Sequence, residues 1–226
     1  MKRTAPGVAA VVTALLLGVT ALLLGVTGCG NDAGASTGTL QTPSATKAPA
    51  GARDKATKNT LAGLVVLPRG YVGDPRGTTG AFTATTFLGS WSADPALDRA
   101  LLLNAGFVEG YRASRLSPDK KKQFTVQLFK AASPAKAKAL QQGFWSQDTH
   151  ERGFDVPNAL SDARVQYDGG TGQSEAVAEV SFVVGALVAE LTIRQTGALG
   201  TDPRPDTALL KTLAAQQKAR LTTRSS

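Results

Sequence analysis

The chain has 226 residues, is 42% apolar and carries a formal net charge of +8 at pH 7. That length and apolar content suffice for one ordinary domain with a real core, which excludes wholesale disorder. A single Cys and a single His exclude an intramolecular disulfide framework, a multi-cysteine metal site and a multi-histidine metal site.

The first 28 residues have the pattern of a leader for export. Lys2 and Arg3 precede a run without charge from Thr4 to Gly30, most of which is apolar. A basic start followed by an apolar run is typical of a secretory signal peptide, whose positive end stays in the cytoplasm. The sequence therefore predicts a signal peptide over residues 1–28.

The end of this run, Val26-Thr27-Gly28-Cys29, resembles the lipobox of bacterial lipoproteins: an aliphatic residue, two small residues and then a cysteine. The resemblance covers residues 1–29. It implies cleavage between Gly28 and Cys29 and a diacylglyceryl group on the Cys29 thiol; we expect no other cofactor. Two acyl chains hold a protein on a membrane stably, whereas one holds it only marginally. An uncleaved transmembrane anchor over Val8–Gly28 is the alternative, since about 20 apolar residues span a bilayer.

Residues 29–60 are predicted to be the lipidated Cys29 followed by a flexible tether. Small and polar residues make up this segment, and Leu40 is its only large apolar residue. Such a segment buries too little surface to offset the entropy lost on ordering. With either kind of anchor, membrane lipid would hold residues 61–226 at the extracytoplasmic face of the plasma membrane.

The positive charge does not point to nucleic acid. The leader and the tether each carry a surplus of two positive charges, which leaves four for residues 61–226. The basic run Lys120-Lys121-Lys122 follows Pro118-Asp119, a pair typical of a tight turn. We interpret it as a solvated hairpin tip; a contact to anionic lipid or wall polymer is the alternative. Without a strongly basic face or an aromatic platform, nucleic acid is not expected as a partner.

Residues 61–226 are predicted to form a single globular α+β domain. The expected elements are a strand over Leu61–Leu67, an irregular stretch to Gly80, a helix from Asp94-Pro95 to Gly106, strands over Phe107–Leu116 and Gln123–Phe129, a helix from Ser133-Pro134, a strand over Arg164–Tyr167, a hairpin of Glu175–Val184 and Leu187–Thr196, and a helix capped by Asp206. Strand pairs followed by helices favour one antiparallel sheet of about five to six strands with helices packed on one face, in the order α-β-β-α-β-β-β-α. The strand order in the sheet stays open.

Apolar spacing predicts which faces are buried. Phe124, Val126 and Leu128 should share one face of their strand, with Thr125 and Gln127 on the other. The expected apolar stripes of the three helices are Leu97, Leu101 and Ala105; Ala137, Leu140 and Phe144; and Leu209, Leu213 and Leu221.

No assembled catalytic set is visible in the sequence. His150 lies among charged residues just past a helix end, and we interpret it as a cap, because a general base needs a nucleophile and an orienting carboxylate. The glycine-rich segment Asp168–Ser174 lacks the lysine of a phosphate-binding loop and leads into a strand, so it is interpreted as a connection. Two carboxylates could face each other as in a glycosidase, although no local motif supports this. Four aromatic residues with polar atoms could line a ligand groove, although packing in the core or at its boundary is the default interpretation: Trp91, Tyr111, Trp145 and Tyr167.

The lipobox, the tether and a composition rich in Ala, Gly, Leu and Arg with a single Ile together resemble cell-surface lipoproteins of actinobacteria. The globular part suggests no characterised family. We therefore predict a membrane-anchored, non-catalytic binding or sensing module with no metal, whose partner is a wall polymer or another surface protein. The alternatives are an extracytoplasmic hydrolase acting on envelope material and a structural envelope-assembly protein. The ligand and the oligomeric state stay open.

Overall fold

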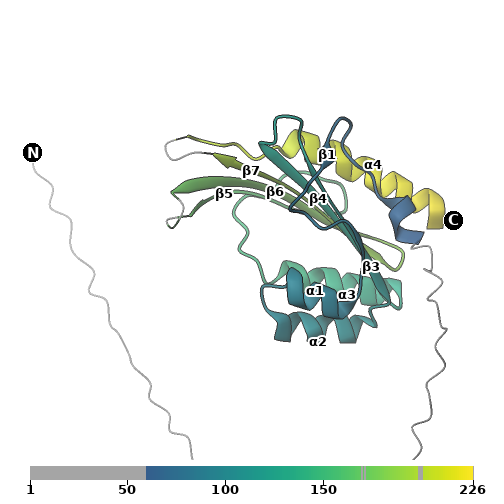
Figure 1. Cartoon of the computed structure of the whole chain (residues 1–226). Coiled ribbons are helices and arrows are strands. Elements are labelled where there is room, and N and C mark those ends of the chain that lie inside the picture. Colours follow the sequence, from purple (N-terminus) through teal and green to yellow (C-terminus); the bar gives the residue numbers. More distant parts are fainter. Residues whose placement is uncertain (1–59, 169, 171, 198–200, 226) are drawn as a thin grey trace, which may run out of the picture. The chain divides into compact units, whose positions relative to one another are not determined.

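The computed structural model of the chain describes residues 60–168, 170, 172–197 and 201–225 (Figure 1). The predicted signal peptide, Gly28, Cys29 and all of the predicted tether except Thr60 lie outside these residues. The elements in chain order are η1 (Thr60–Leu64), β1 (Val72–Gly73), β2 (Gly80–Phe82), α1 (Ala84–Ser90), α2 (Pro95–Ala105), β3 (Glu109–Leu116), β4 (Lys122–Lys130), α3 (Pro134–Trp145), β5 (Leu160–Asp168), β6 (Gln173–Val184), β7 (Leu187–Gly197) and α4 (Thr207–Ser225).

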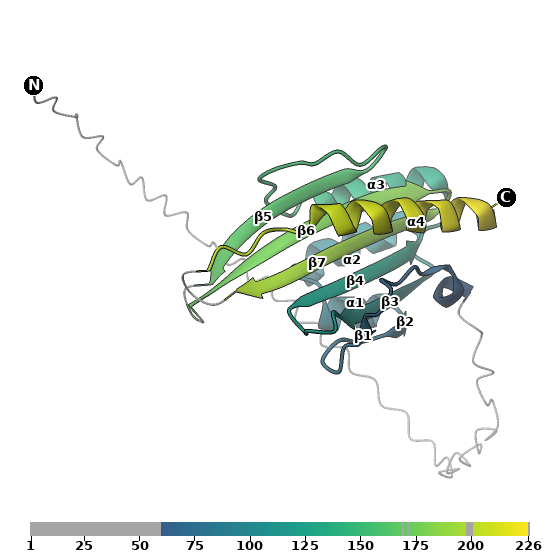
Figure 2. The same ribbon diagram turned by 90° about the horizontal axis from the view of Figure 1, so that it is seen from above.

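The strands of the described residues form one seven-stranded sheet, seen from above in Figure 2. Its order is β1-β3-β4-β7-β6-β5, with β2 paired to β3, and every pairing is antiparallel. The two predicted hairpins, β3–β4 and β6–β7, are joined by the pairing of β4 with β7. The predicted α+β class with a single antiparallel sheet is therefore confirmed, and the short strands β1 and β2 add to the expected number.

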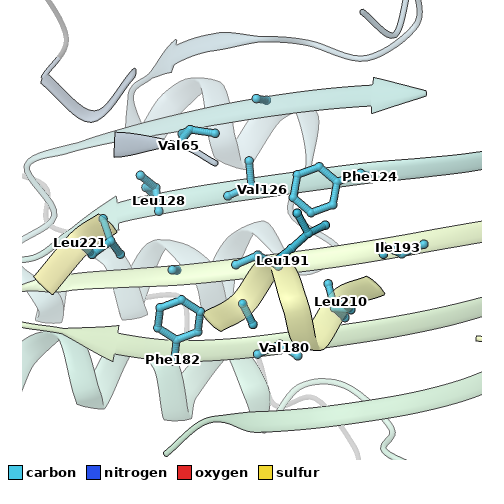
Figure 3. Packing of buried hydrophobic residues seen from close by; sticks show 14 of the residues in the cluster. Val65, Phe124, Val126, Leu128, Val180, Phe182, Leu191, Ile193, Leu210 and Leu221 are labelled. Atoms are coloured by element: carbon cyan, nitrogen blue, oxygen red, sulfur yellow. The ribbon is translucent and has the colours of Figure 1, made fainter. Parts of the chain in front are cut away.

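One face of the sheet is apolar along β4, β7 and β6, and α4 covers it (Figure 3). Its sheet residues are at most 1% exposed: Phe124, Val126, Leu128, Ala178, Val180, Phe182, Ala189, Leu191 and Ile193. From α4, Leu210, Leu213, Ala214 and Leu221 pack on them. Strict alternation puts these residues on one side of their strands, as the sequence predicted. Each large side chain buried here contributes about 1.5–3 kcal/mol to stability.

The opposite face carries α1, α2 and α3 (Figure 1). Phe129 and Val188 of the sheet are fully buried beneath these helices. The ring of Phe129 lies 5.1 Å from that of Phe144 and 5.2 Å from that of Phe87, centroid to centroid. Helices α2 and α3 thus share one face of the sheet, as expected, together with α1, whereas α4 lies on the other face. Helices must cover both faces of the sheet here, because β6 and β7 carry apolar side chains on each face next to the turn that joins them.

The predicted helix starts are confirmed by their caps. The Asp94 carboxylate accepts hydrogen bonds from the amides of Ala96 and Leu97 at 3.1 and 3.0 Å. The Ser133 hydroxyl accepts from the amide of Lys136, and the Asp206 carboxylate from that of Leu209. Gly106 ends α2 with a left-handed φ of 59°, a conformation that glycine adopts at little cost.

The strand predicted over Leu61–Leu67 is wrong. Its first half is the 3₁₀ helix η1, and the rest pairs with no strand among the described residues. The buried side chain of Gln217 on α4 accepts from the amide of Val66 at 2.7 Å and donates to the carbonyl of Leu64 at 2.8 Å. One amide side chain thereby supplies hydrogen bonds that a neighbouring strand would otherwise give.

Two further expectations need correction. Helix α1 was not predicted, because only Phe87 and Leu88 are buried in it and no apolar period marks it. In α2 the expected stripe fails at its start: Leu97 is 45% exposed, while Leu102, outside the stripe, is 2% exposed. The helix is rotated so that Leu102 and Ala105 contact the aromatic cluster.

Candidate functional site

The face of the sheet beneath α1–α3 changes from apolar to polar along its strands. Phe129, Val188 and Val183 lie side by side across β4, β7 and β6, under the helices. Two residues further along, the direct cross-strand partners are Arg112 on β3, Gln127 on β4, Glu190 on β7 and Ser181 on β6. Because side chains alternate with a period of two, this row lies on the same face as the apolar one. We call these four residues the polar row.

The polar row lies in a cleft of about 600 Å³ between the sheet and the helices. Its helical wall comes from Phe87, Trp91, Asp98, Phe144 and Trp145, and its floor continues through Thr125, Thr192 and Glu179. Ligand pockets in proteins usually have volumes of about 300–1,000 Å³. The cleft is therefore large enough for a small organic molecule.

Three buried polar atoms of the row lack a partner among the described residues: Nε of Arg112, Nε2 of Gln127 and Oγ of Ser181. Ser181 is only 2% exposed. Leaving a buried polar group without a hydrogen bond costs about 1–3 kcal/mol. Three such atoms in one cross-strand row of the cleft floor are consistent with a site that a bound molecule completes.

Glu190 is the fourth member of the row, half-buried at the floor of the cleft. Its carboxyl makes no hydrogen bond or ion pair with the described residues. Burial raises the pKa of Glu190 to about 8, and the nearby carboxylates of Glu179, Asp148 and Asp98 raise it as well, against a smaller opposing effect of Arg112. At neutral pH this carboxyl is mostly protonated and can donate a hydrogen bond.

Arg112 supplies a cation at the other end of the row. Its guanidinium carbon lies 5.0 Å from the centre of the Trp91 ring, a cation–π contact. Burial lowers the pKa of Arg112, and the charge of Arg194 lowers it further, but an arginine stays protonated in spite of such shifts. The cleft thus holds a permanent positive charge at β3 and a titratable carboxyl two strands away at β7.

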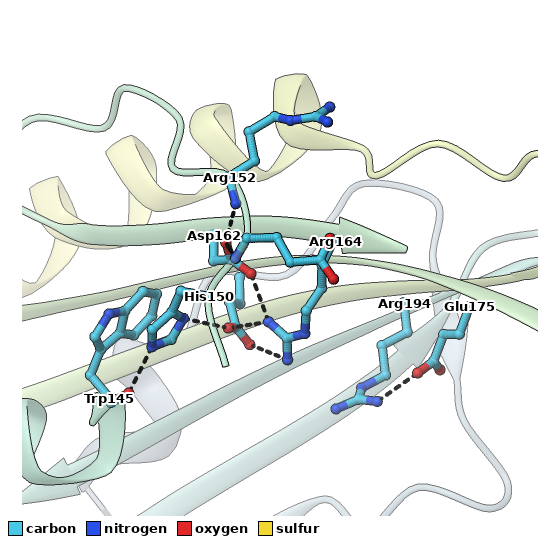
Figure 4. Close-up of polar contacts among 9 residues, drawn as sticks. Trp145, His150, Arg152, Asp162, Arg164, Glu175 and Arg194 are labelled. Carbon is cyan, nitrogen blue, oxygen red and sulfur yellow. Dashed lines mark hydrogen bonds and ion pairs between the residues drawn. The ribbon is translucent and has the colours of Figure 1, made fainter. Parts of the chain in front are cut away.

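Beside the cleft, at the β5 edge of the same sheet face, an ion-pair network links β5, β6 and the segment after α3 (Figure 4). Arg164 Nη1 donates to Asp162 Oδ2 at 2.9 Å and also to Glu179. The other Asp162 oxygen accepts from the amides of Glu151 and Arg152, both at 2.8 Å. Burial alone would raise the pKa of Asp162, but Arg164 and the two amides lower it below its ordinary value. Asp162 is fully buried, so its charge must be compensated this completely.

His150 belongs to this network. Its Nε2 lies 2.7 Å from the carbonyl of Trp145, the last residue of α3, and its ring stacks on the Trp145 ring at 4.1 Å. Nδ1 lies 3.7 Å from Glu179. The interpretation of His150 as a helix cap is confirmed by the first of these contacts.

His150, Asp162 and Glu179 could present three metal-ligand atoms within 4.8 Å of one another. However, Arg164 bonds both carboxylates, and the remaining Asp162 oxygen is held by backbone amides. A divalent cation would have to displace a buried guanidinium, so we assign this cluster to structure.

The other candidates that the sequence suggested are spread more widely. Cys29 and Gly28 lie outside the described residues. Of the basic run, Lys120 and Lys121 are exposed in the β3–β4 turn, as predicted, while Lys122 pairs with Asp206 at 2.6 Å. The glycine-rich segment connects β5 to β6, as interpreted. Both tryptophans line the cleft, whereas Tyr111 packs against the core beneath α4 and Tyr167 is exposed.

Sequence reasoning missed the polar row. It placed Gln127 correctly on the face opposite Phe124, but gave no reason to expect a cleft on that face. It did not single out Arg112 or Glu190, because nothing local marks them. Only the pairing of four strands places them side by side.

Among the described residues, no helix is both long and apolar enough to cross a bilayer. No protein-family model matches the chain, and no curated protein matches it. The chain is similar to a solved structure, the extracellular domain of PknH from Mycobacterium tuberculosis, at 10% sequence identity and a TM-score of 0.37, over 68% of this chain and 80% of that one. A likeness at this level supports no transfer of fold or function, so the site must be judged by its own geometry.

Proposed function

We propose that the protein is a lipid-anchored binding or sensing module on the extracytoplasmic face of the membrane, and that the cleft containing the polar row is its ligand site. The lipobox resemblance and the apolar leader support the location, and the cleft supports the binding role. The observation that carries the proposal is the set of unpartnered buried atoms on Arg112, Gln127 and Ser181.

A structural role for the row is the less favourable explanation. Elsewhere this protein bonds its buried carboxylates thoroughly: Asp74 accepts from the Ser114 hydroxyl at 2.8 Å and from Gln123 at 2.5 Å, and Asp162 accepts from Arg164 and two amides. Of the five buried side-chain atoms without a partner among the described residues, three lie in the polar row, and the other two, Ser92 Oγ and Arg164 Nε, belong to other elements. Such a concentration in one row is expected where a ligand takes the place of the missing partners.

The binding role is tested by a thermal-shift screen of the full chain in detergent against amino acids, sugars, organic acids and wall fragments. We expect one compound class to raise the unfolding temperature, and Gln127→Ala to remove the shift. Gln166→Ala, which changes an exposed glutamine of β5, is the matched control. If every shift survives in Gln127→Ala, the cleft is not the site.

The location is tested by Cys29→Ala. We expect this variant to appear in the medium or as a longer, unlipidated precursor, while the wild-type chain partitions into detergent. Unchanged partitioning together with an unchanged mass would contradict the lipid anchor.

A second candidate, an extracytoplasmic hydrolase, is favoured by one feature. Glu190 and Glu179 are diagonal neighbours on β7 and β6, because Glu190 pairs with Ser181 and Glu179 with Thr192. Diagonal side chains lie about 7–8 Å apart, and paired carboxyls of glycosidases lie about 5–9.5 Å apart. One protonated and one ionised carboxyl would suit acid catalysis, although Glu179 is committed to Arg164. Turnover of a wall glycan that Glu190→Gln abolishes would establish this activity and overturn the purely binding role.

A further inference from the structure

The charges that line the cleft are unequal in number and separated in space. Its carboxyls are Asp98, Asp148, Glu175, Glu179 and Glu190, and its guanidiniums are those of Arg112 and Arg194. Arg194 already pairs with Glu175 at 2.9 Å, and Glu179 pairs with Arg164 of the neighbouring strand β5. The charged groups left for a ligand are therefore one guanidinium, Arg112, and the carboxyls around Glu190.

These groups form two poles. At the β3–β4 side, Arg112 and Gln127 are direct cross-strand partners, and each presents an N–H without a partner among the described residues. Two adjacent donors of this kind fit the two oxygens of a carboxylate or the oxygen of an amide. At the β7–β6 side, the negative charges of Glu179, Asp148 and Asp98 act on Glu190. The same charges would attract and stabilise an ammonium group at this position. Adjacent strands are about 4.8 Å apart, which places the poles within reach of one small molecule.

The same features disfavour other ligands. A dianion would face the surplus of carboxylates. A sugar would be expected to stack on an exposed aromatic face. However, the Arg112 guanidinium lies over the Trp91 ring at 5.0 Å, and the His150 ring stacks on the Trp145 ring at 4.1 Å. Complementary charge at two poles is then the dominant recognition element.

We infer that the cleft binds a zwitterion of the amino-acid or short-peptide class, with its carboxylate on Arg112 and Gln127 and its ammonium group at Glu190. The inference rests on the proposed function, because it specifies the ligand of that same cleft. It also assigns a role to the neutral state of Glu190: the free site avoids an uncompensated buried charge, and the arriving ammonium group stabilises the carboxylate.

Binding should therefore release a proton. Since the pKa of Glu190 is about 8 in the free protein, its carboxyl is mostly protonated at pH 7 and becomes ionised beside the ligand. Affinity should rise about tenfold for each pH unit between 6 and 8 and then level off, as long as the ligand's own amine stays protonated. The charged groups that act on Glu190 are the carboxyls of Asp98 and Asp148 on the helix side of the cleft, the carboxyl of Glu179 on β6 and the guanidinium of Arg112 on β3.

The test is isothermal titration calorimetry of the full chain in detergent with the common L-amino acids and with L-alanyl-L-alanine. Each ligand that binds is compared with its N-acetyl form, which lacks the ammonium group, and its amide, which lacks the carboxylate. We expect at least tenfold weaker binding for the N-acetyl form and for the amide of a free amino acid. Titration in buffers of different ionisation enthalpy should show release of nearly one proton at pH 7 in the wild-type chain.

The matched variants are Glu190→Gln and Glu109→Gln. The first should abolish proton release and flatten the pH dependence, and the second, which changes a β3 carboxyl outside the cleft, should preserve both. Circular dichroism of each variant verifies its fold. If sugars or organic acids bind in a manner that Gln127→Ala abolishes, while zwitterions do not bind, this inference is overturned and the binding role stands. If no compound of any class binds, both fail.

Discussion

The two faces of the central sheet use the same strands differently. On the α4 face, the successive rows across β4, β7 and β6 are apolar and covered. On the α1–α3 face, the row of Phe129, Val188 and Val183 is apolar and covered, while the polar row beside it opens into the cleft. The first face is a continuous core, and the second is a core for only part of its length.

This difference separates stability from function within one sheet. Alternation along a strand lets one face be selected for packing while the other carries polar side chains. The α4 face can therefore hold the sheet together even where unpartnered polar groups on the opposite face lower its stability. Substitutions on the two faces should differ in the same way.

The largest contrast is expected between Phe182→Ala and Thr192→Ala. Phe182 is 1% exposed in the core beneath α4, so truncating it leaves a cavity and should lower the free energy of unfolding by about 3–5 kcal/mol. Thr192 lines the open cleft, and its truncation should cost less than about 1 kcal/mol. Urea denaturation at pH 7 measures both. Equal losses would mean that the two faces contribute alike.

A second contrast lies within the polar face, between its bonded and unbonded groups. Arg164→Ala leaves the fully buried Asp162 without its cation and should lower stability by about 3 kcal/mol. Arg164→Ala in an Asp162→Ala background should cost clearly less, because the orphaned charge is gone. A double-mutant cycle by urea denaturation gives the coupling energy; additive losses would show that the network does not act as a unit.

The sequence predicted those parts of the fold that depend on local signals. The caps at Asp94, Ser133 and Asp206 follow from helix chemistry, and the two hairpins follow from turn residues and alternation. It was wrong at Leu61–Leu67, where an apolar run suggested a strand but the distant Gln217 supplies its hydrogen bonds. No local pattern carries that contact.

The candidate site depends almost entirely on contacts of this distant kind. Arg112 and Ser181 belong to different hairpins, and only the β4–β7 pairing brings their strands into one row. The helical wall of the cleft also depends on a contact between distant residues: a Cβ at Gly143 of α3 would collide with the Leu101 side chain of α2. Glycine lets α2 and α3 approach closely. This requirement is visible only once both helices are placed.

The third prediction concerns the pH dependence of stability caused by Glu190. An unfolded glutamate loses its proton near pH 4.5 and the folded Glu190 near 8, so the folded chain holds more protons in between and this group lowers stability as pH rises through that window. Glu190→Gln should therefore be more stable than wild type by about 2 kcal/mol at pH 8.5, a shift of one pKa unit being worth about 1.4 kcal/mol and solvent access at a half-buried site reducing the total. Glu109→Gln should show no such gain. A constant difference between pH 5 and 8.5 would contradict the raised pKa.

The smallest effect is expected at the exposed end of the cleft floor. Arg194 and Glu175 form an ion pair at 2.9 Å with side chains 46% and 30% exposed, so water and salt screen it. Arg194→Ala should change stability by less than about 1 kcal/mol, and high salt should erase the difference, whereas the loss in Arg164→Ala should persist because the Arg164 side chain is only 7% exposed. Urea denaturation at low and high salt compares the two. If Arg194→Ala were as costly as Arg164→Ala, the open end of the cleft would be part of the structural network.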